Sequence, residues 1–235
     1  MNNPMKHLVI IPARAGSKSV PKKNLKKVGG ISLIRRACLL ALALKDTEII
    51  VSTDDSEVIS EIKDLEVVIF ARSAEYASDF STTEESMLEV IENINHEKFN
   101  SIVLIQPTSP FINPKDLEKG LEIYKKNHEL VPFLAVNHKC YNWLMVDQKW
   151  VPNKFDSNLR SPRQQTTESI IETGGFWIMN KKNFLNKKSR YCGIPIPVVT
   201  QKIYSYEIDE LEDLYAAQDM AKRIDQELPH LKLDK

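Results

Sequence analysis

Short apolar runs alternate with segments of helical periodicity along the first half of this chain, and this alternation limits the possible folds more than any other feature. The apolar runs have the composition of strands buried on both faces, and they span 7–11, 48–52, 66–70 and 101–106. Apolar residues recur at helical spacing in the segments 32–45, 56–63, 81–95 and 114–127. This order predicts a three-layer α/β fold with a mostly parallel sheet covered by helices on both faces.

The second half of the sequence is less regular. Two strand-like runs, 131–136 and 142–146, are followed by a polar stretch that contains Pro152 and Pro162. A parallel-sheet pattern does not fit this region, which instead suggests a small antiparallel excursion from the main body. We expect this excursion to span 133–165.

The chain then returns to the sheet and closes with a helix. Runs at 174–180 and 196–200 have strand character, and 210–227 has helical periodicity. With 235 residues, of which 42% are hydrophobic, the chain can bury one sizeable core. We therefore expect a single domain over 1–235.

The charge balance and the first apolar run limit the classes of partner. The 32 Lys and Arg residues are matched by 32 Asp and Glu residues, so no overall field attracts nucleic acid or an anionic membrane. The first apolar run is too short for a signal peptide or a membrane span, so we expect a cytoplasmic protein. The 3 cysteines and 5 histidines lack the spacing of a zinc site or a disulfide framework.

Polar side chains directly follow the predicted strands. In open parallel sheets, ligands bind at the carboxyl ends of the strands. The residues found there are Arg14, Ser17, Lys18, Lys23, Asp54, Asp55, Arg72 and the segment 106–109. Arginine and lysine suit phosphate groups and carboxylates suit magnesium, so this set predicts a site for a polyanion bound with a divalent metal.

The loop after the first strand, IIPARAGSKSVPKKN, is neither of the two best-known phosphate loops. A Walker A motif would require Gly at position 11 and Lys at position 17, where Ile11 and Ser17 stand. After Gly16 the next glycines are Gly29 and Gly30, so the dinucleotide fingerprint G-x-G-x-x-G is absent as well.

This loop and five later blocks resemble, in order and spacing, the acylneuraminate cytidylyltransferases, the CMP–sialic acid synthetase family. The later blocks are VSTDD at 51–55, ARSAEYASDFSTT at 71–83, LIQPTSPF at 104–111, PRQQ at 162–165 and YEIDELEDL at 206–214. The resemblance implies a nucleotide-diphospho-sugar transferase-like fold. It also implies that the anomeric hydroxyl of a nine-carbon 2-keto sugar acid attacks the α-phosphorus of CTP and releases pyrophosphate.

The same resemblance implies roles for individual residues. The implied catalytic residues are Arg14, Lys18, Lys23 and Asp209. The implied nucleotide-binding residues are Arg14, Ser17, Lys18, Lys23, Asn24, Arg72 and Thr83. The implied sugar-binding residues are Gln106, Arg163 and Gln164. Magnesium, or manganese, is expected on Asp209 with Glu207, because side chains two positions apart on an extended chain share one face.

Several positions depart from the family pattern. Glu207 stands in place of an aspartate, Gly174 in place of a sugar-contacting asparagine, and Phe111-Ile112 in place of Leu-Arg. These changes cluster in the sugar half of the site, so the nucleotide is better defined than the sugar. The clustering motivates the hypothesis of a legionaminic- or pseudaminic-type acid.

The sequence leaves alternatives open for the function and for two aspartates. The enzyme could instead activate the eight-carbon acid Kdo, or the chain could be a non-catalytic nucleotide-binding module. Asp54 and Asp55 could cap the following helix or serve the nucleotide. The resemblance also implies a homodimer, in which the excursion reaches toward the neighbouring site.

Overall fold

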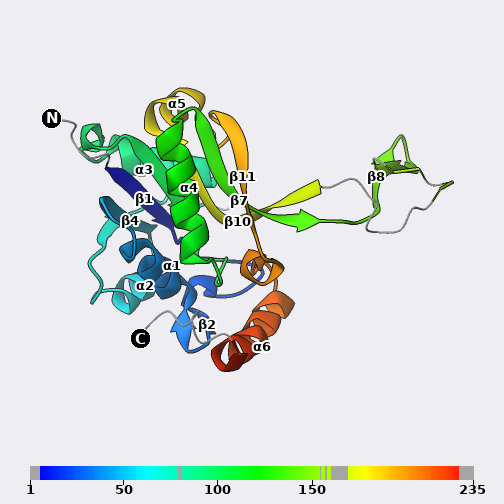
Figure 1. Cartoon of the computed structure of the whole chain (residues 1–235). Helices are drawn as coiled ribbons and strands as arrows, with labels where there is room; N and C mark the ends of the chain where they lie inside the picture. The colour runs from blue at the N-terminus through cyan, green and yellow to red at the C-terminus, as the bar shows by residue number, and fades with distance from the viewer. Residues whose placement is uncertain (1–5, 79–80, 154, 157, 160–168, 228–235) are drawn as a thin grey trace.

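The computed structural model describes residues 6–78, 81–153, 155–156, 158–159 and 169–227. Its centre is a seven-stranded sheet with the strand order β11-β7-β10-β6-β1-β4-β5 (Figure 1). The strands are β1 (His7–Pro12), β4 (Thr47–Thr53), β5 (Val68–Ala71), β6 (Ser101–Ile105), β7 (Leu130–His138), β10 (Ser169–Asn180) and β11 (Ile194–Thr200). Within this sheet β10 runs antiparallel to both of its neighbours and the other paired strands are parallel, which confirms the predicted mostly parallel sheet.

Helices cover both faces of the sheet, as predicted. One face carries α1 (Leu33–Leu42), α2 (Ser56–Glu61) and α4 (Pro114–Lys126), and the other carries α3 (Thr83–Glu92) and α5 (Lys181–Lys187). The alternation of side chains along β1 explains why both faces need a cover. Val9 and Ile11 pack into the first core cluster, whereas Leu8 and Ile10 pack into the second.

The helices begin at residues that satisfy their first backbone N–H groups. Ser32 caps α1, as predicted, by accepting a hydrogen bond from the N–H of Arg35 at 3.3 Å. Thr82 and Glu85 form a reciprocal capping box at the start of α3. The sequence analysis did not predict α5, whose seven residues bury only Phe184 and therefore lack a helical apolar pattern.

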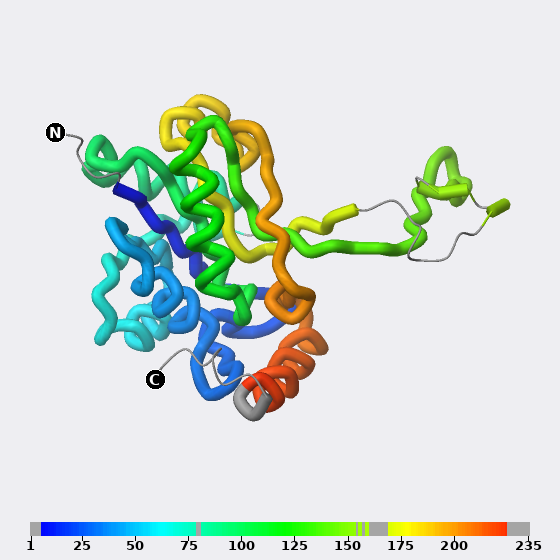
Figure 2. The backbone as a smooth tube through the Cα atoms, in the orientation of Figure 1, coloured from blue at the N-terminus to red at the C-terminus, as the bar shows by residue number. Residues whose placement is uncertain are grey.

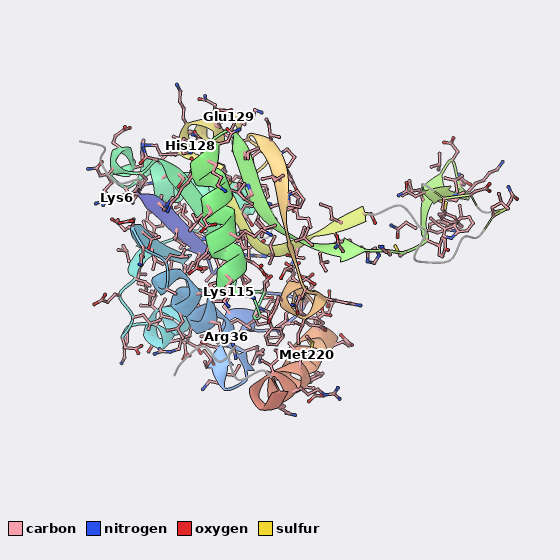
Figure 3. All side chains as sticks on the ribbon, in the orientation of Figure 1. Lys6, Arg36, Lys115, His128, Glu129 and Met220 are labelled. Atoms are coloured by element: carbon pink, nitrogen blue, oxygen red, sulfur yellow. The ribbon has the colours of Figure 1, made fainter. Side chains whose placement is uncertain are left out.

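A third core cluster lies where the strands β1, β4, β5 and β6 end, which we call the carboxyl edge. Here α6 (Leu211–Glu227) covers the short hairpin of β2 (Lys27–Val28) and β3 (Ile31–Ser32). Gly29 and Gly30 form its turn with φ of 60° and 80°, a conformation that favours glycine. Figure 3 labels Arg36 and Met220 at this end of the molecule, and Lys6, His128 and Glu129 at the opposite end.

The part of the chain that the structure describes also contains three short 3-10 helices in its connections. They are η1 (Lys23–Leu25), η2 (His96–Lys98) and η4 (Lys202–Ser205). The first of them lies inside the loop after β1, and the third precedes the segment that leads into α6. Both therefore belong to connections at the carboxyl edge.

The strands β7 and β10 run together away from the body and lead to a separate hairpin (Figures 1 and 2). This hairpin, which we call the arm, consists of β8 (Asn142–Val146) and β9 (Lys149–Asn153) joined by Asp147 and Gln148, both with positive φ. The whole of β8 is exposed.

The boundary of the excursion needs a correction. The run 131–136, which had seemed not to fit a parallel sheet, lies in β7 and pairs with β11 in parallel. Phe133, where the excursion was expected to begin, is buried in the core together with Leu134 and Ala135. The pattern misled because one strand serves both the core and the projecting part, so burial changes along its length.

None of the described helices is both long and apolar enough to cross a membrane.

His7 makes the stability of the fold depend on pH. Its side chain is 1% exposed, and its Nδ1 lies 2.5 Å from Oγ of Ser101. Burial, followed by the charge of Lys125, lowers the pKa of His7 from 6.5 to about 4. The unfolded chain therefore takes up a proton at a higher pH than the folded protein does.

We expect the free energy of unfolding to decrease as the pH falls from 6.5 to 4, with His7 contributing up to roughly 3 kcal/mol of the loss. His7→Gln should remove this part, because the amide can still bond Ser101 but does not titrate. Urea unfolding of both proteins at pH 7, 5.5 and 4.5 measures the difference. Identical pH slopes would contradict the assignment.

Candidate active site

Two side-chain hydrogen bonds hold the loop after β1 against the end of β4, and a third closes the loop on itself. Thr53 donates its hydroxyl to the carbonyl of Ala13 at 2.6 Å, and the Asp54 carboxylate accepts the N–H of Ala15 at 2.7 Å. Asn24 donates its side-chain amide to the carbonyl of Arg14 at 3.1 Å. The loop is therefore shaped by β4 and by its own later residues before any ligand binds.

Arg14 lies on this loop, and Arg72 lies beside it. Arg72 is 8% exposed and donates to Oγ and to the carbonyl of Ser52, both at 3.0 Å. Burial lowers the pKa of its guanidinium, which still stays charged at neutral pH, and the carboxylates of Asp54 and Glu89 oppose that shift. Arg14 reaches the carbonyl of Ala77 at 3.4 Å. Positive charge is thus concentrated at the ends of β1 and β5.

The loop also holds a segment from the far end of the chain. Lys23 donates from Nζ to the carbonyls of Ile208 at 3.0 Å and Asp209 at 2.9 Å, and only 11% of its side chain is exposed. The hydroxyl of Ser19 donates to the same carbonyl of Asp209. These contacts bring the predicted metal-binding pair 207 and 209 to the first loop.

The carboxylates of Glu207 and Asp209 have different surroundings. Glu207 accepts the N–H of Gly174 at 3.1 Å and the hydroxyl of Thr108 at 3.4 Å. Burial raises the pKa of Glu207, and the negative charge of Asp209 raises it further. The Asp209 side chain is 70% exposed, with Oδ1 4.0 Å from Nζ of Lys23.

This pair fits a hard divalent cation, which prefers oxygen ligands and would relieve the repulsion between two carboxylates. The described residues contain no group of three or more His, Cys, Asp or Glu side chains arranged to hold a metal.

The other predicted residues lie at or near the same edge. Ser17 is half-buried and Lys18 is exposed in the first loop, and Thr83 is the first residue of α3. Gln106 follows β6 and donates its backbone N–H to the carbonyl of Gly175 at 3.1 Å. Arg163 and Gln164, predicted to bind the sugar acid, lie outside the described residues.

Asp54 and Asp55, which could each cap a helix or serve the nucleotide, make different contacts. Asp55 is the N-cap of α2 and accepts the N–H of Glu57 at 2.8 Å. Asp54 instead holds the first loop, as described above. The capping alternative therefore applies to Asp55.

Sequence reasoning gave no positioning role to several residues that shape the site. Ser19 and Asp213 both act on Asp209, the first through its carbonyl and the second by accepting its N–H at 3.0 Å. Thr108 and Gly174 hold the Glu207 carboxylate. Thr108 lies in the LIQPTSPF block and Ser19 in the first loop, IIPARAGSKSVPKKN, so both lie within blocks that carry the family resemblance.

Comparison with known proteins decides the family. The profile of the family described as Cytidylyltransferase matches residues 8–218. The chain belongs to this family.

Curated relatives of the chain carry the names of sugar acids. A CMP-N,N'-diacetyllegionaminic acid synthase from Legionella pneumophila is 35% identical over 128 residues, which cover 52% of this chain and 54% of the relative. An N-acylneuraminate cytidylyltransferase from Streptococcus agalactiae is 25% identical over 215 residues, which cover 89% of this chain and 52% of the relative. The chain thus spans about half the length of the curated relatives it matches.

Solved structures support the fold. A CMP:2-keto-3-deoxy-manno-octonic acid synthetase complexed with CTP has a TM-score of 0.67 at 19% identity, covering 95% of this chain and 100% of that one. A 4-diphosphocytidyl-2C-methyl-D-erythritol synthase from Anaerococcus prevotii has a TM-score of 0.69 at 16% identity, covering 93% and 97%. The predicted nucleotide-diphospho-sugar transferase-like fold is confirmed.

The two neighbouring aspartates offer a matched test of the site. Asp54→Ala removes the acceptor for Ala15, so we expect the KM for the nucleotide to rise about tenfold with little change in stability. Asp55→Ala removes a helix cap, so we expect about 1 kcal/mol lower stability and an unchanged KM. Steady-state kinetics and urea unfolding measure both effects. An equal rise of KM in the two variants would contradict the separation of roles.

Proposed function

We propose that this cytidylyltransferase couples CTP to the anomeric hydroxyl of a nine-carbon 2-keto sugar acid and releases pyrophosphate, with magnesium bound. The observation that carries the proposal is the contact between the first loop and the segment 207–209, made by Lys23 and Ser19. It puts a cationic loop and two carboxylates at one edge of the sheet, as a nucleoside triphosphate with its metal requires.

The cationic side chains stabilise the phosphates. Arg14 and Lys18 lie on the first loop, and their charges offset the negative charge that the α-phosphate and the leaving pyrophosphate carry. Lys23 adds its charge while it holds the backbone of residues 208 and 209. Asn24 and Arg72 support the walls of the nucleotide end through Arg14 and Ser52.

The metal would be held by Asp209, with the carboxylate of Glu207 close by. When bound, magnesium neutralises phosphate oxygens and fixes the geometry of the triphosphate. The exposed carboxylate of Asp209 points to this use, because Lys23 approaches it only at 4.0 Å.

The comparison with curated relatives supports a legionaminic-type acid. The diacetyllegionaminic acid synthase is 35% identical to the matched part of this chain, against 25% for the N-acylneuraminate cytidylyltransferase. The second candidate is the eight-carbon acid of the structural neighbour with bound CTP, whose likeness concerns the fold.

The projecting arm supports a homodimer. Its exposed apolar side chains are Trp143, Leu144, Met145, Val146 and Trp150. An exposed apolar patch on a projecting hairpin is typical of a surface that packs on another chain. A second copy of this chain would bury it next to the neighbouring site.

Pyrophosphate release tests the reaction. We expect it from CTP with magnesium and a legionaminic or another nine-carbon acid, but not from ATP, GTP or UTP. Lys18→Met should lower kcat/KM for CTP by about 100-fold, because the positive charge that offsets the phosphates is lost. Lys27→Met, on the surface, is the control and should leave kcat/KM unchanged. Preference for Kdo over every nine-carbon acid would overturn the substrate assignment, and no turnover with any acid would overturn the activity.

Sedimentation tests the dimer. We expect the wild-type protein to sediment as a dimer, and Leu144→Glu with Trp150→Glu to raise the dimer dissociation constant at least about tenfold by burying charge. Ser60→Glu, an exposed change on α2, is the control. A wild-type monomer that turns over at full rate would contradict the proposal.

A further inference from the structure

Gly174 has a spatial reason to be a glycine. Positive φ does not explain it, because the glycines with positive φ are Gly16, Gly29 and Gly30. A Cβ at position 174 would lie 1.8 Å from Oε1 and 2.4 Å from Cδ of Glu207. The Glu207 carboxylate therefore fills the volume that any side chain at 174 would need.

The Glu207 carboxylate is held in that volume from two sides. The N–H of Gly174 donates to Oε2 at 3.1 Å, and the hydroxyl of Thr108 donates to Oε1 at 3.4 Å. The next backbone N–H, that of Ile208, donates to the carbonyl of Thr108 at 2.9 Å. The segment is thus docked on β10 and on the loop after β6 at once.

This docking acts on Asp209 through the backbone. Beyond Ile208, the carbonyl of Asp209 is bound by Lys23 and Ser19, and its N–H is bound by Asp213. The backbone of Asp209 is consequently held on both sides, while 70% of its side chain stays exposed. The two carboxylates therefore have different roles. That of Glu207 is bonded within the protein, whereas that of Asp209 is exposed.

We propose that Gly174 and Glu207 act as one unit that positions Asp209, so that Asp209 is the metal-binding carboxylate and Glu207 a positioning residue. This inference rests on the proposed function. The length of the glutamate matters more than its charge, because its terminal oxygen must reach the N–H of Gly174. A glutamine reaches equally far and offers an amide oxygen to that N–H, whereas an aspartate is one methylene shorter.

The first test measures how much magnesium strengthens CTP binding. Calorimetry without sugar acid gives the CTP dissociation constant in EDTA and in magnesium, and the ratio of the first to the second is compared among variants. Gly174→Ala displaces the carboxylate and Glu207→Asp withdraws it, so each should lower the ratio about tenfold. The double variant should be no worse than either single one. Glu207→Gln should stay within about threefold of the wild type, and Glu210→Gln is the exposed control.

Two outcomes would overturn the proposal. Independent effects, with about a 100-fold loss in the double variant, would show that the residues are not one unit. A higher ratio of the two CTP dissociation constants for Glu207→Asp than for Glu207→Gln would indicate that Glu207 is a direct metal ligand. A general structural defect would lower CTP binding in EDTA as well, which the ratio separates from loss of positioning.

A second test needs no nucleotide. The same cycle in urea should show that Gly174→Ala shifts the unfolding midpoint clearly in the wild type and much less in Glu207→Asp, because the shorter side chain leaves room for the new methyl group. Equal shifts in both backgrounds would show that the contact does not exist in solution. If wild-type protein fails to bind CTP while this coupling is present, the proposed function fails and the contact stands.

Discussion

Two hydrogen bonds from Nζ of Lys23, to the carbonyls of Ile208 and Asp209, join the first loop to the segment ahead of α6. A lysine with 11% of its side chain exposed must satisfy its ammonium group, and here main-chain oxygens do so. Everything at the site depends on this closure, because it brings the cations after β1 next to the carboxylates 207 and 209. Without it, the two charge types would lie on separate connections.

The direction of β10 has an equal share in building the site. Because β10 runs against its neighbours, its first residues extend beyond the carboxyl edge, and Gly175 near its middle lies at that edge, beside Gln106. Gly174 therefore meets Glu207 at the edge where parallel strands present their ligand-binding loops. One reversed strand thus supplies a backbone donor where a parallel strand would supply a loop.

The sequence allowed prediction of the layers, most elements and the location of the site, because these follow from local periodicity and from the rule for open parallel sheets. The start of the excursion could not be predicted, since burial decreases along the single strand β7. The mutual fit of Gly174 and Glu207 was beyond reach for another reason. Each residue departs from the family pattern, but 33 positions separate them, and only the folded chain shows that Glu207 occupies the space beside Gly174.

The proposed function places CTP between the first loop and Asp209. A crystal structure of the protein with CTP and magnesium, without sugar acid, tests it most directly. We predict that the triphosphate contacts Arg14 and Lys18 and that the metal contacts the carboxylate of Asp209. A triphosphate bound away from the carboxyl edge, or a metal with no contact to Asp209, would contradict the account.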